Sequence, residues 1–301
     1  MNSISLKDAR VSYSDTGTGE PVLMIHCSSA SGNEWRNLCK VLGDRFRTVV
    51  PDQWGCGRSD PWTGRGAFRL VDEAEPVLWI LDGLDSPVHL VGHSYGGGVA
   101  LKVARERPGA IRSLTLIEPS VFHLLEPGAR KEQVLFEEIT RVARAVRDAV
   151  ATGDYWGGME RFVNYWGGAD AWRSMRHDAR LRMAQRLPKV VLDFHALFSE
   201  PATLADYARL THPTLLMCGE NSPGPSRRIV DLLDSAMPDA RIARVPAAGH
   251  MSPLTHPGPV NAEIVAHLEA NGSRRPVARI QGHLPDRLRG NPAGELAGLA
   301  V

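Results

Sequence analysis

A serine between two glycines is the residue whose type and spacing point most clearly to chemistry. The sequence Gly92-His93-Ser94-Tyr95-Gly96 follows the aliphatic run 88–91 and leads directly into a helical pattern. A strand, sharp turn and helix of this kind lift the serine side chain above the sheet, and the glycines let strand and helix approach closely. Ser94 is therefore the candidate nucleophile, and it would need a base to take its hydroxyl proton.

This turn resembles the nucleophile turn of the α/β-hydrolase superfamily, and the stretch 52–60 resembles the Asp-x-x-Gly-x-Gly-x-Ser loop common there. The resemblance extends over about residues 3–270 and is to small members of the esterase and lipase kind. It implies an α/β-hydrolase fold, with a mostly parallel central sheet, helices on both faces and an inserted helical cap. The stretch 52–60 is expected to shape turns rather than to take part in chemistry.

The resemblance also indicates the base. Among 11 histidines, His250 follows Ala248-Gly249 just beyond the last predicted strand, where the superfamily places its catalytic histidine. His93 adjoins the nucleophile, but neighbouring side chains diverge on a tight turn. We therefore expect His93 to pack or hydrogen-bond beside the site, and His250 to be the base.

The acid that would orient the base departs from the superfamily's usual pattern. The superfamily commonly carries an aspartate in the loop after the strand that here is 214–217, and this chain has Ser222 in that place. A hydroxyl cannot stabilise an imidazolium as a carboxylate does. Glu118 and Glu220 compete for the role. Glu118 is favoured because some members take their acid from the strand after the nucleophile strand, and parallel strand ends gather at one edge.

Developing negative charge on a tetrahedral intermediate needs fixed hydrogen-bond donors. The residue after the nucleophile, Tyr95, would supply one backbone amide. By resemblance to the superfamily's His-Gly-x loop, Ser28 would supply the second. Cys27 stands where the superfamily usually has glycine.

Six further residues are candidates for the substrate pocket. They are His26, Trp35, Phe122, Trp156, Trp166 and Met251. The aromatic rings among them could form an apolar acyl pocket, although a single aromatic residue more often packs in a core.

The elements that must position these residues alternate between strands and helices. Expected strands are 3–6, 11–14, 22–25, 48–50, 88–92, 113–117, 214–217 and 241–245; expected covering helices are 76–83, 229–233 and 260–268. Alternation at this spacing predicts a mainly parallel sheet with helices on both faces.

Between two of these strands, the helical period of apolar residues over 135–150 predicts an all-helical cap at 127–210. The α/β-hydrolase core then comprises 1–126 and 211–272. Residues 273–301 are rich in Arg, Pro and Gly and are expected to form a poorly ordered tail.

Composition limits the classes of partner. A net charge of +1 gives no reason to expect nucleic acid or an anionic membrane, and the apolar runs are too short to span a bilayer. The N-terminus does not resemble a signal peptide, and the four cysteines lack Cys-x-x-Cys spacing. We therefore expect a cytoplasmic protein with reduced thiols, no metal and no cofactor. The oligomeric state is left open.

These residues predict a serine hydrolase that cleaves a carboxylic ester or related small acyl compound through an acyl-enzyme, with Ser94, His250 and Glu118 as triad. By resemblance, haloalkane dehalogenases and epoxide hydrolases are disfavoured because they use a carboxylate nucleophile. Two alternatives stay open. One is a non-catalytic small-molecule-binding protein that lost its acid at Ser222, and the other is an acyltransferase or C–C hydrolase of the same fold.

Overall fold

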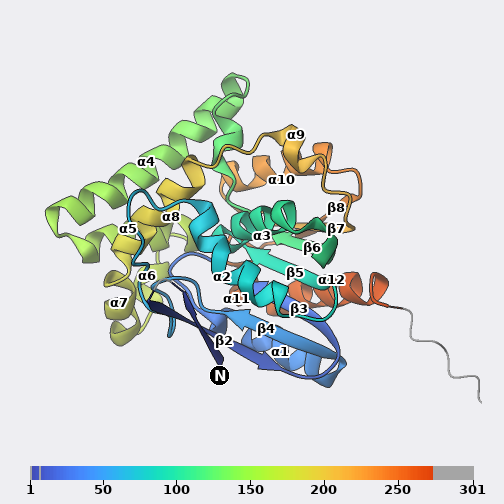
Figure 1. Cartoon of the computed structure of the whole chain (residues 1–301). Helices are drawn as coiled ribbons and strands as arrows, with labels where there is room; N and C mark the ends of the chain where they lie inside the picture. Colours follow the sequence, from blue (N-terminus) through green and yellow to red (C-terminus); the bar gives the residue numbers. More distant parts are fainter. Residues whose placement is uncertain (1, 7, 274–301) are drawn as a thin grey trace, which may run out of the picture.

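An eight-stranded sheet forms the centre of the protein in the computed structural model, which describes residues 2–6 and 8–273 (Figure 1). The strands are β1 (Asn2–Leu6), β2 (Ala9–Thr16), β3 (Glu20–Ile25), β4 (Phe46–Pro51), β5 (Val88–His93), β6 (Ile111–Ile117), β7 (Thr214–Gly219) and β8 (Ala240–Val245). Their spatial order is β1-β2-β4-β3-β5-β6-β7-β8. β1 pairs antiparallel with β2 and β2 with β4, and every other pair is parallel. The predicted mostly parallel α/β fold is confirmed.

Alternate residues of the buried strands feed two separate cores. In β3, Val22 and Met24 join one apolar cluster, while Leu23 and Ile25 join the other. The first cluster includes side chains of α1 (Arg36–Leu42) and α12 (Pro257–Ala270), and the second includes those of α2 (Leu70–Asp82), α3 (Tyr95–Glu106) and α10 (Gly224–Ala236). Because successive strand residues point to opposite faces, helices on both sides bury the sheet. The remaining short helices of the core are η1 (Gly32–Trp35), η2 (Gly43–Arg45), η3 (Pro108–Ala110) and α11 (Ser252–Thr255).

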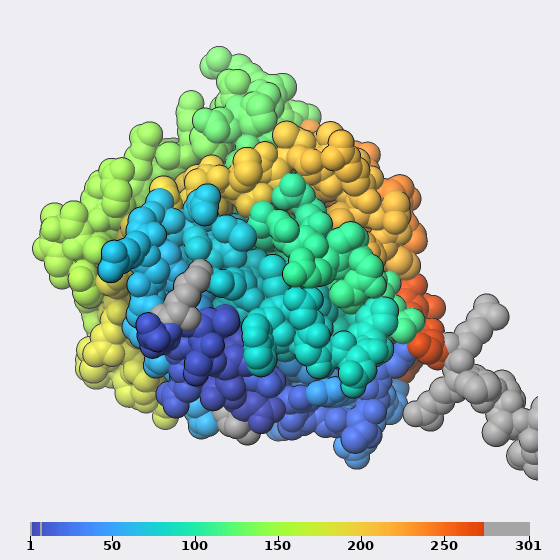
Figure 2. Space-filling view, in the orientation of Figure 1, coloured from blue at the N-terminus to red at the C-terminus, as the bar shows by residue number. Residues whose placement is uncertain are grey.

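Helices and loops make up the chain between β6 and β7, where the sequence predicted a helical insertion. The helices are η4 (Phe122–Leu125), α4 (Arg130–Thr152), α5 (Tyr155–Gly167), α6 (Ala171–Ser174), α7 (His177–Ala184), α8 (Leu187–Phe198) and α9 (Leu204–Tyr207). Figure 2 shows the green and yellow segments of this insertion gathered along one side of the molecule. The expected tail at 273–301 lies, apart from Ser273, outside the described residues. Within the described part of the chain, no helix has the length and apolarity to cross a membrane.

Helix α2 begins at Leu70, six residues before the predicted start at Pro76. Proline lacks the amide that would donate to the carbonyl of Asp72 one turn earlier, which makes it a common helix start in sequence. Here the indole Nε1 of Trp54 donates to that Asp72 carbonyl at 3.0 Å. A tryptophan from another segment thus replaces the missing helix bond, and the helix extends across the proline.

Replacing Trp54 by Phe removes this donor, and we expect a loss of about 1–3 kcal/mol in the free energy of unfolding from the unpaired carbonyl. In a Pro76→Ala background the new amide at 76 can donate to Asp72. The cost of Trp54→Phe should then be smaller by about 1 kcal/mol. Urea unfolding of the four proteins measures both costs, and equal costs in the two backgrounds would contradict this account of α2.

Candidate active site

Ser94 lies on a strained turn between β5 and α3. Its φ of 55° and ψ of −119° are unusual for a residue other than glycine. A Cβ on Gly92 would lie 2.4 Å from the carbonyl oxygen of Gly96, and a Cβ on Gly96 would lie 2.4 Å from that of Ile25. The two glycines are therefore required for strand and helix to meet. The Ser94 amide donates to the carbonyl of Ile117 at 2.9 Å, which fixes the turn to the end of β6.

Three side chains from distant parts of the sequence meet at this turn. His250 Nε2 lies 2.8 Å from Ser94 Oγ, and His250 Nδ1 lies 2.6 Å from Glu118 Oε2. All three residues are buried. A carboxylate only accepts hydrogen bonds, so Nδ1 carries the proton and Nε2 accepts from the serine hydroxyl. This geometry is the one that a nucleophile, a base and an orienting acid require.

Glu118, not Glu220, contacts His250. The other oxygen of Glu118, Oε1, accepts from the Gly219 amide at 2.9 Å and from Ser222 Oγ at 2.6 Å. Ser222, in the place of the superfamily's aspartate, thus hydrogen-bonds to the carboxylate that contacts the histidine. Glu220 is exposed, and its Oε2 accepts from the amide of Ala247 at 3.2 Å.

The environment favours a neutral histidine beside an ionised acid. Burial lowers the pKa of His250 below its ordinary value, although Glu118 acts in the opposite direction. Burial opposes the charge of Glu118, but His250, the Gly219 amide and the Ser222 hydroxyl outweigh it and hold the pKa of Glu118 low. Near neutral pH His250 is therefore in the form that can accept a proton.

A second histidine–carboxylate pair supports the base from behind. His93 Nε2 donates to the carbonyl of His250 at 2.9 Å, and His93 Nδ1 lies 2.5 Å from Glu34 Oε1. Burial lowers the pKa of His93, but Glu34 overrides this and raises it. His93 thus carries both ring protons and fixes the backbone of His250. Sequence reasoning expected His93 beside the site but gave no sign of Glu34 as its partner.

The same pair belongs to a cluster with the spacing of metal ligands. Atoms of Cys27, Glu34 and His93 lie within 4.8 Å of one another. However, Glu34 Oε2 already accepts from the Cys27 amide at 2.8 Å, and both nitrogens of His93 are engaged. Burial raises the pKa of the Cys27 thiol well above its ordinary value, so the thiol stays protonated. These atoms serve one another as hydrogen-bond partners.

Backbone strain is concentrated around the site. The described non-glycine residues with positive φ are Asp8, Ser29, Ser94, Glu118 and Ala247. Ser94 and Glu118 both contact His250. Ser29 follows Ser28, the predicted oxyanion residue, and Ala247 lies three residues before His250. Such conformations persist only where surrounding contacts enforce them, and they cluster at functional sites.

The predicted oxyanion residues flank the nucleophile. Tyr95 is the first residue of α3, and Ser28 lies in the loop after β3. Both line the same small cavity as Ser94. Among the described residues, neither backbone amide has a hydrogen-bond acceptor. Ser120 was not predicted: its hydroxyl lies 3.2 Å from Ser94 Oγ and can donate to it.

Two cavities of very different size meet at Ser94. One has a volume of about 620 Å³ and is lined by His250, Met251 and Leu254, among others. The other has a volume of about 20 Å³ and includes Val190 and Phe194 of α8. Their linings share Ser28, Ser94, Phe162 and Trp166.

The structure corrects half of the predicted pocket. Phe122 lines the small cavity, Met251 the large one and Trp166 both, with its ring centroid 4.2 Å from that of His250. The other three candidates line neither cavity. Trp35 packs in the core beneath α1 and α12. Trp156 packs edge-on against Trp172 within the insertion, with their ring centroids 5.0 Å apart. The ring of His26 is engaged with Cys27 and Gln53.

Comparison with known proteins identifies the family. Residues 20–257 match the family model described as alpha/beta hydrolase fold, so the chain belongs to that family. It is 32% identical over 124 residues to cis-3-alkyl-4-alkyloxetan-2-one decarboxylase of Shewanella oneidensis, covering 40% of this chain and 39% of that protein. It is 26% identical over 275 residues to haloalkane dehalogenase 2 of Mycobacterium tuberculosis, covering 85% of this chain and 90% of that one. A match of 29% identity to polyketide synthase ThaQ of Burkholderia thailandensis covers 87% of this chain but 12% of the synthase.

Solved structures show the same fold. A thermophilic esterase from Thermogutta terrifontis superimposes with a TM-score of 0.69 at 22% sequence identity, covering 88% of this chain and 95% of that one. The predicted α/β-hydrolase fold and superfamily are therefore confirmed.

The charges around His250 predict how it titrates. Burial, together with the nearby charge of His93, lowers the pKa of His250 below its ordinary value, although Glu118 and Glu34 stabilise the imidazolium. Glu118→Gln removes the favourable charge, so the His250 midpoint should move further down, while the exposed Glu220→Gln should leave it unchanged. NMR of the imidazole protons against pH measures this. A midpoint above 6.5, or an upward shift in Glu118→Gln, would contradict the assignment.

Proposed function

We propose that this protein is a serine hydrolase that cleaves carboxylic esters through an acyl-enzyme on Ser94. The observation that carries the proposal is the hydrogen-bonded line from Glu118 through His250 to Ser94 Oγ, with donor–acceptor distances of 2.6 and 2.8 Å. His250 takes the hydroxyl proton as Ser94 attacks the carbonyl carbon, and returns it to the leaving alcohol. Water, activated by the same imidazole, then releases the acid.

Glu118 is the orienting acid in this proposal. It accepts the Nδ1 proton of His250 and stabilises the imidazolium that forms during attack. Its second oxygen is held by Gly219 and Ser222. The alternative of a binding protein without catalysis rested on the missing aspartate at 222, and the contact of Glu118 with His250 supports the enzyme over that alternative.

The amides of Ser28 and Tyr95 form the oxyanion hole in this proposal. Both are free of other acceptors among the described residues, and Tyr95 begins a helix whose N-terminal amides favour negative charge. Fixed donors of this kind stabilise the tetrahedral oxyanion.

The two cavities suggest which side of the ester is small. His250 must protonate the leaving group, and it lines the large cavity and not the small one. The alcohol part of the substrate therefore occupies the 620 Å³ cavity, and the acyl part occupies the 20 Å³ cavity. A volume of that size holds about one or two heavy atoms. The substrate we propose is a short-chain acyl ester of a bulky, largely apolar alcohol.

The expectations on cofactors, location and partners remain part of this proposal. The function needs no metal or cofactor, because acid–base chemistry and the oxyanion donors supply each step. The free thiols of all four cysteines fit the predicted cytoplasmic location. We expect no nucleic-acid or membrane partner. Transfer of the acyl group to an acceptor other than water stays an alternative to hydrolysis.

Variants test the triad directly. In hydrolysis of p-nitrophenyl acetate, Ser94→Ala should reduce kcat to background. Glu118→Gln should reduce it roughly 10³- to 10⁴-fold, because the imidazolium loses its counter-charge. The matched change Glu220→Gln should leave kcat within about 2-fold. If Glu220→Gln lost activity while Glu118→Gln kept it, the assignment of the acid would be reversed.

Acyl length tests the small cavity. For p-nitrophenyl esters, kcat/KM should fall at least about 10-fold from acetate to octanoate, since a longer chain cannot enter the small cavity. Val190→Ala should flatten this dependence by enlarging that cavity. Leu254→Ala, in the large cavity, is the control and should leave the acyl-length profile unchanged. An activity that rises with acyl length in the wild type would refute this placement of the acyl group.

A further inference from the structure

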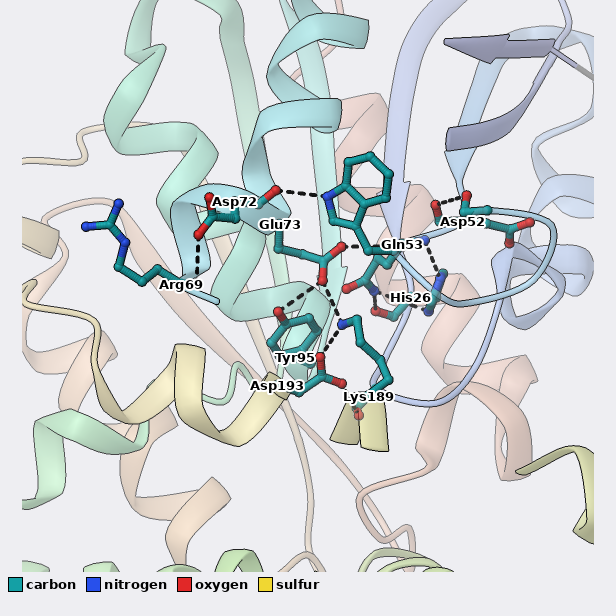
Figure 3. A network of polar contacts seen from close by, with 12 residues as sticks. His26, Asp52, Gln53, Arg69, Asp72, Glu73, Tyr95, Lys189 and Asp193 are labelled. Atoms are coloured by element: carbon teal, nitrogen blue, oxygen red, sulfur yellow. Dashed lines mark hydrogen bonds and ion pairs between the residues drawn. The ribbon is translucent and has the colours of Figure 1, made fainter. Parts of the chain in front are cut away.

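Three charged side chains lie buried between the core and the insertion. Glu73 belongs to α2, and Lys189 and Asp193 lie one turn apart on α8 (Figure 3). Lys189 Nζ donates to Glu73 Oε2 at 2.8 Å and also to Asp193 Oδ1. The exposed fractions of the three side chains are 1%, 8% and 3%. We call these residues the carboxylate–lysine cluster.

The cluster is an expensive way to attach a helix. Removing charges from water is costly, and well-packed apolar side chains of similar volume often give equal or greater stability. Burial opposes the charge of Lys189, but Asp193 and Glu73 hold the pKa of its ammonium above its ordinary value. The lysine is thus charged despite its surroundings. A role in docking α8 is therefore a weak explanation for the cluster.

Both carboxylates of the cluster also hold residues of the proposed oxyanion hole. Ser28 Oγ donates to Asp193 Oδ2 at 2.5 Å. The Tyr95 hydroxyl donates to Glu73 Oε2 at 3.1 Å (Figure 3). Ser28 lies in the loop after β3, and Tyr95 is the first residue of α3. Their side chains bind the two carboxylates of one cluster, and both residues line the small cavity at Ser94.

We propose that Glu73, Lys189 and Asp193 are positioning residues that fix the two amides of the oxyanion hole by holding the side chains of Ser28 and Tyr95. This inference rests on the proposed hydrolase function. It makes the geometry of the hole depend on the docking of α8, a helix of the insertion.

Local backbone conformation explains why the Ser28 loop needs such a tether. Ser29 has a φ of 61°, and the Ala30 amide donates to the Cys27 carbonyl at 3.3 Å, so the loop makes a tight, strained turn. Oxyanion donors act only when they are fixed at hydrogen-bond distance from the developing charge. Without the bond to Asp193, the loop can relax and the Ser28 amide loses its alignment. The transition state is then affected more than substrate binding.

Hydroxyl deletions test the proposal with little risk to folding. In ester hydrolysis, Ser28→Ala and Tyr95→Phe should each lower kcat about 10- to 100-fold with KM changed less than about 3-fold. Ser28→Thr keeps the hydroxyl and should recover kcat to within about 5-fold of the wild type. Ser113→Ala is the matched control, because this buried serine makes one short bond, 2.7 Å to His89 Nδ1, within the sheet. It should leave kcat unchanged.

A double-mutant cycle separates positioning from simple docking. Asp193→Asn should lower kcat strongly in the wild-type background but by less than about 3-fold in Ser28→Ala, because the tether is then already gone. Unchanged kcat in Ser28→Ala, or effects of the two changes that multiply fully, would overturn the proposal. If Asp193→Asn does not fold, the Ser28 and Tyr95 variants still decide.

The failure of this inference can be told apart from the failure of the proposed function. If the wild type does not hydrolyse esters through Ser94, the function is wrong. If the wild type does so and Ser28→Ala equals it, the function stands and the positioning role is wrong.

Discussion

The hydrogen-bonded line from Glu118 through His250 to Ser94 is the constraint to which the surrounding structure conforms. It requires the ends of strands β5 and β6 to be level, and the parallel register achieves this by pairing His93 with Ile117. The next residue on each strand is then Ser94 or Glu118, and both have positive φ. The sheet thus holds two strained residues in place, and the loop after β8 brings the imidazole between them.

In the proposed triad, the acid comes from the strand next to the one whose loop carries Ser222. β6 and β7 are adjacent, and the Glu118 amide donates to the Met217 carbonyl at 3.0 Å. A carboxylate at the end of β6 therefore reaches the imidazole as well as one in the loop after β7 would. Ser222, in that loop, contributes a hydroxyl that holds the carboxylate. The exchange keeps the negative charge behind the histidine and changes only the strand that supplies it.

The sequence predicted the sheet, the helical insertion and the residues that meet at Ser94, because local motifs mark strand ends and parallel strand ends gather at one edge. It did not predict the start of α2, since the donor that satisfies Asp72 is Trp54, 18 residues away. Trp35 and Trp156 were wrongly expected in the pocket, because aromatic character does not reveal which face of an element is buried where. The contacts of Glu34 and Glu73 were missed because their partners, His93 and Lys189, come from distant parts of the chain. A signal for the cluster did exist: Lys189 and Asp193 are spaced i, i+4 within the apolar helix α8, where unpaired charges would be costly.

The central claim is that Ser94 is a nucleophile activated by His250. Reaction of the folded protein with a fluorophosphonate, followed by peptide mapping, tests it most directly, since this reagent modifies serines whose hydroxyl is activated by a base. The account predicts one adduct, on Ser94 in the wild type, that forms far more slowly in His250→Ala. A folded wild-type protein with no adduct on Ser94, or one labelled equally fast without His250, would contradict it.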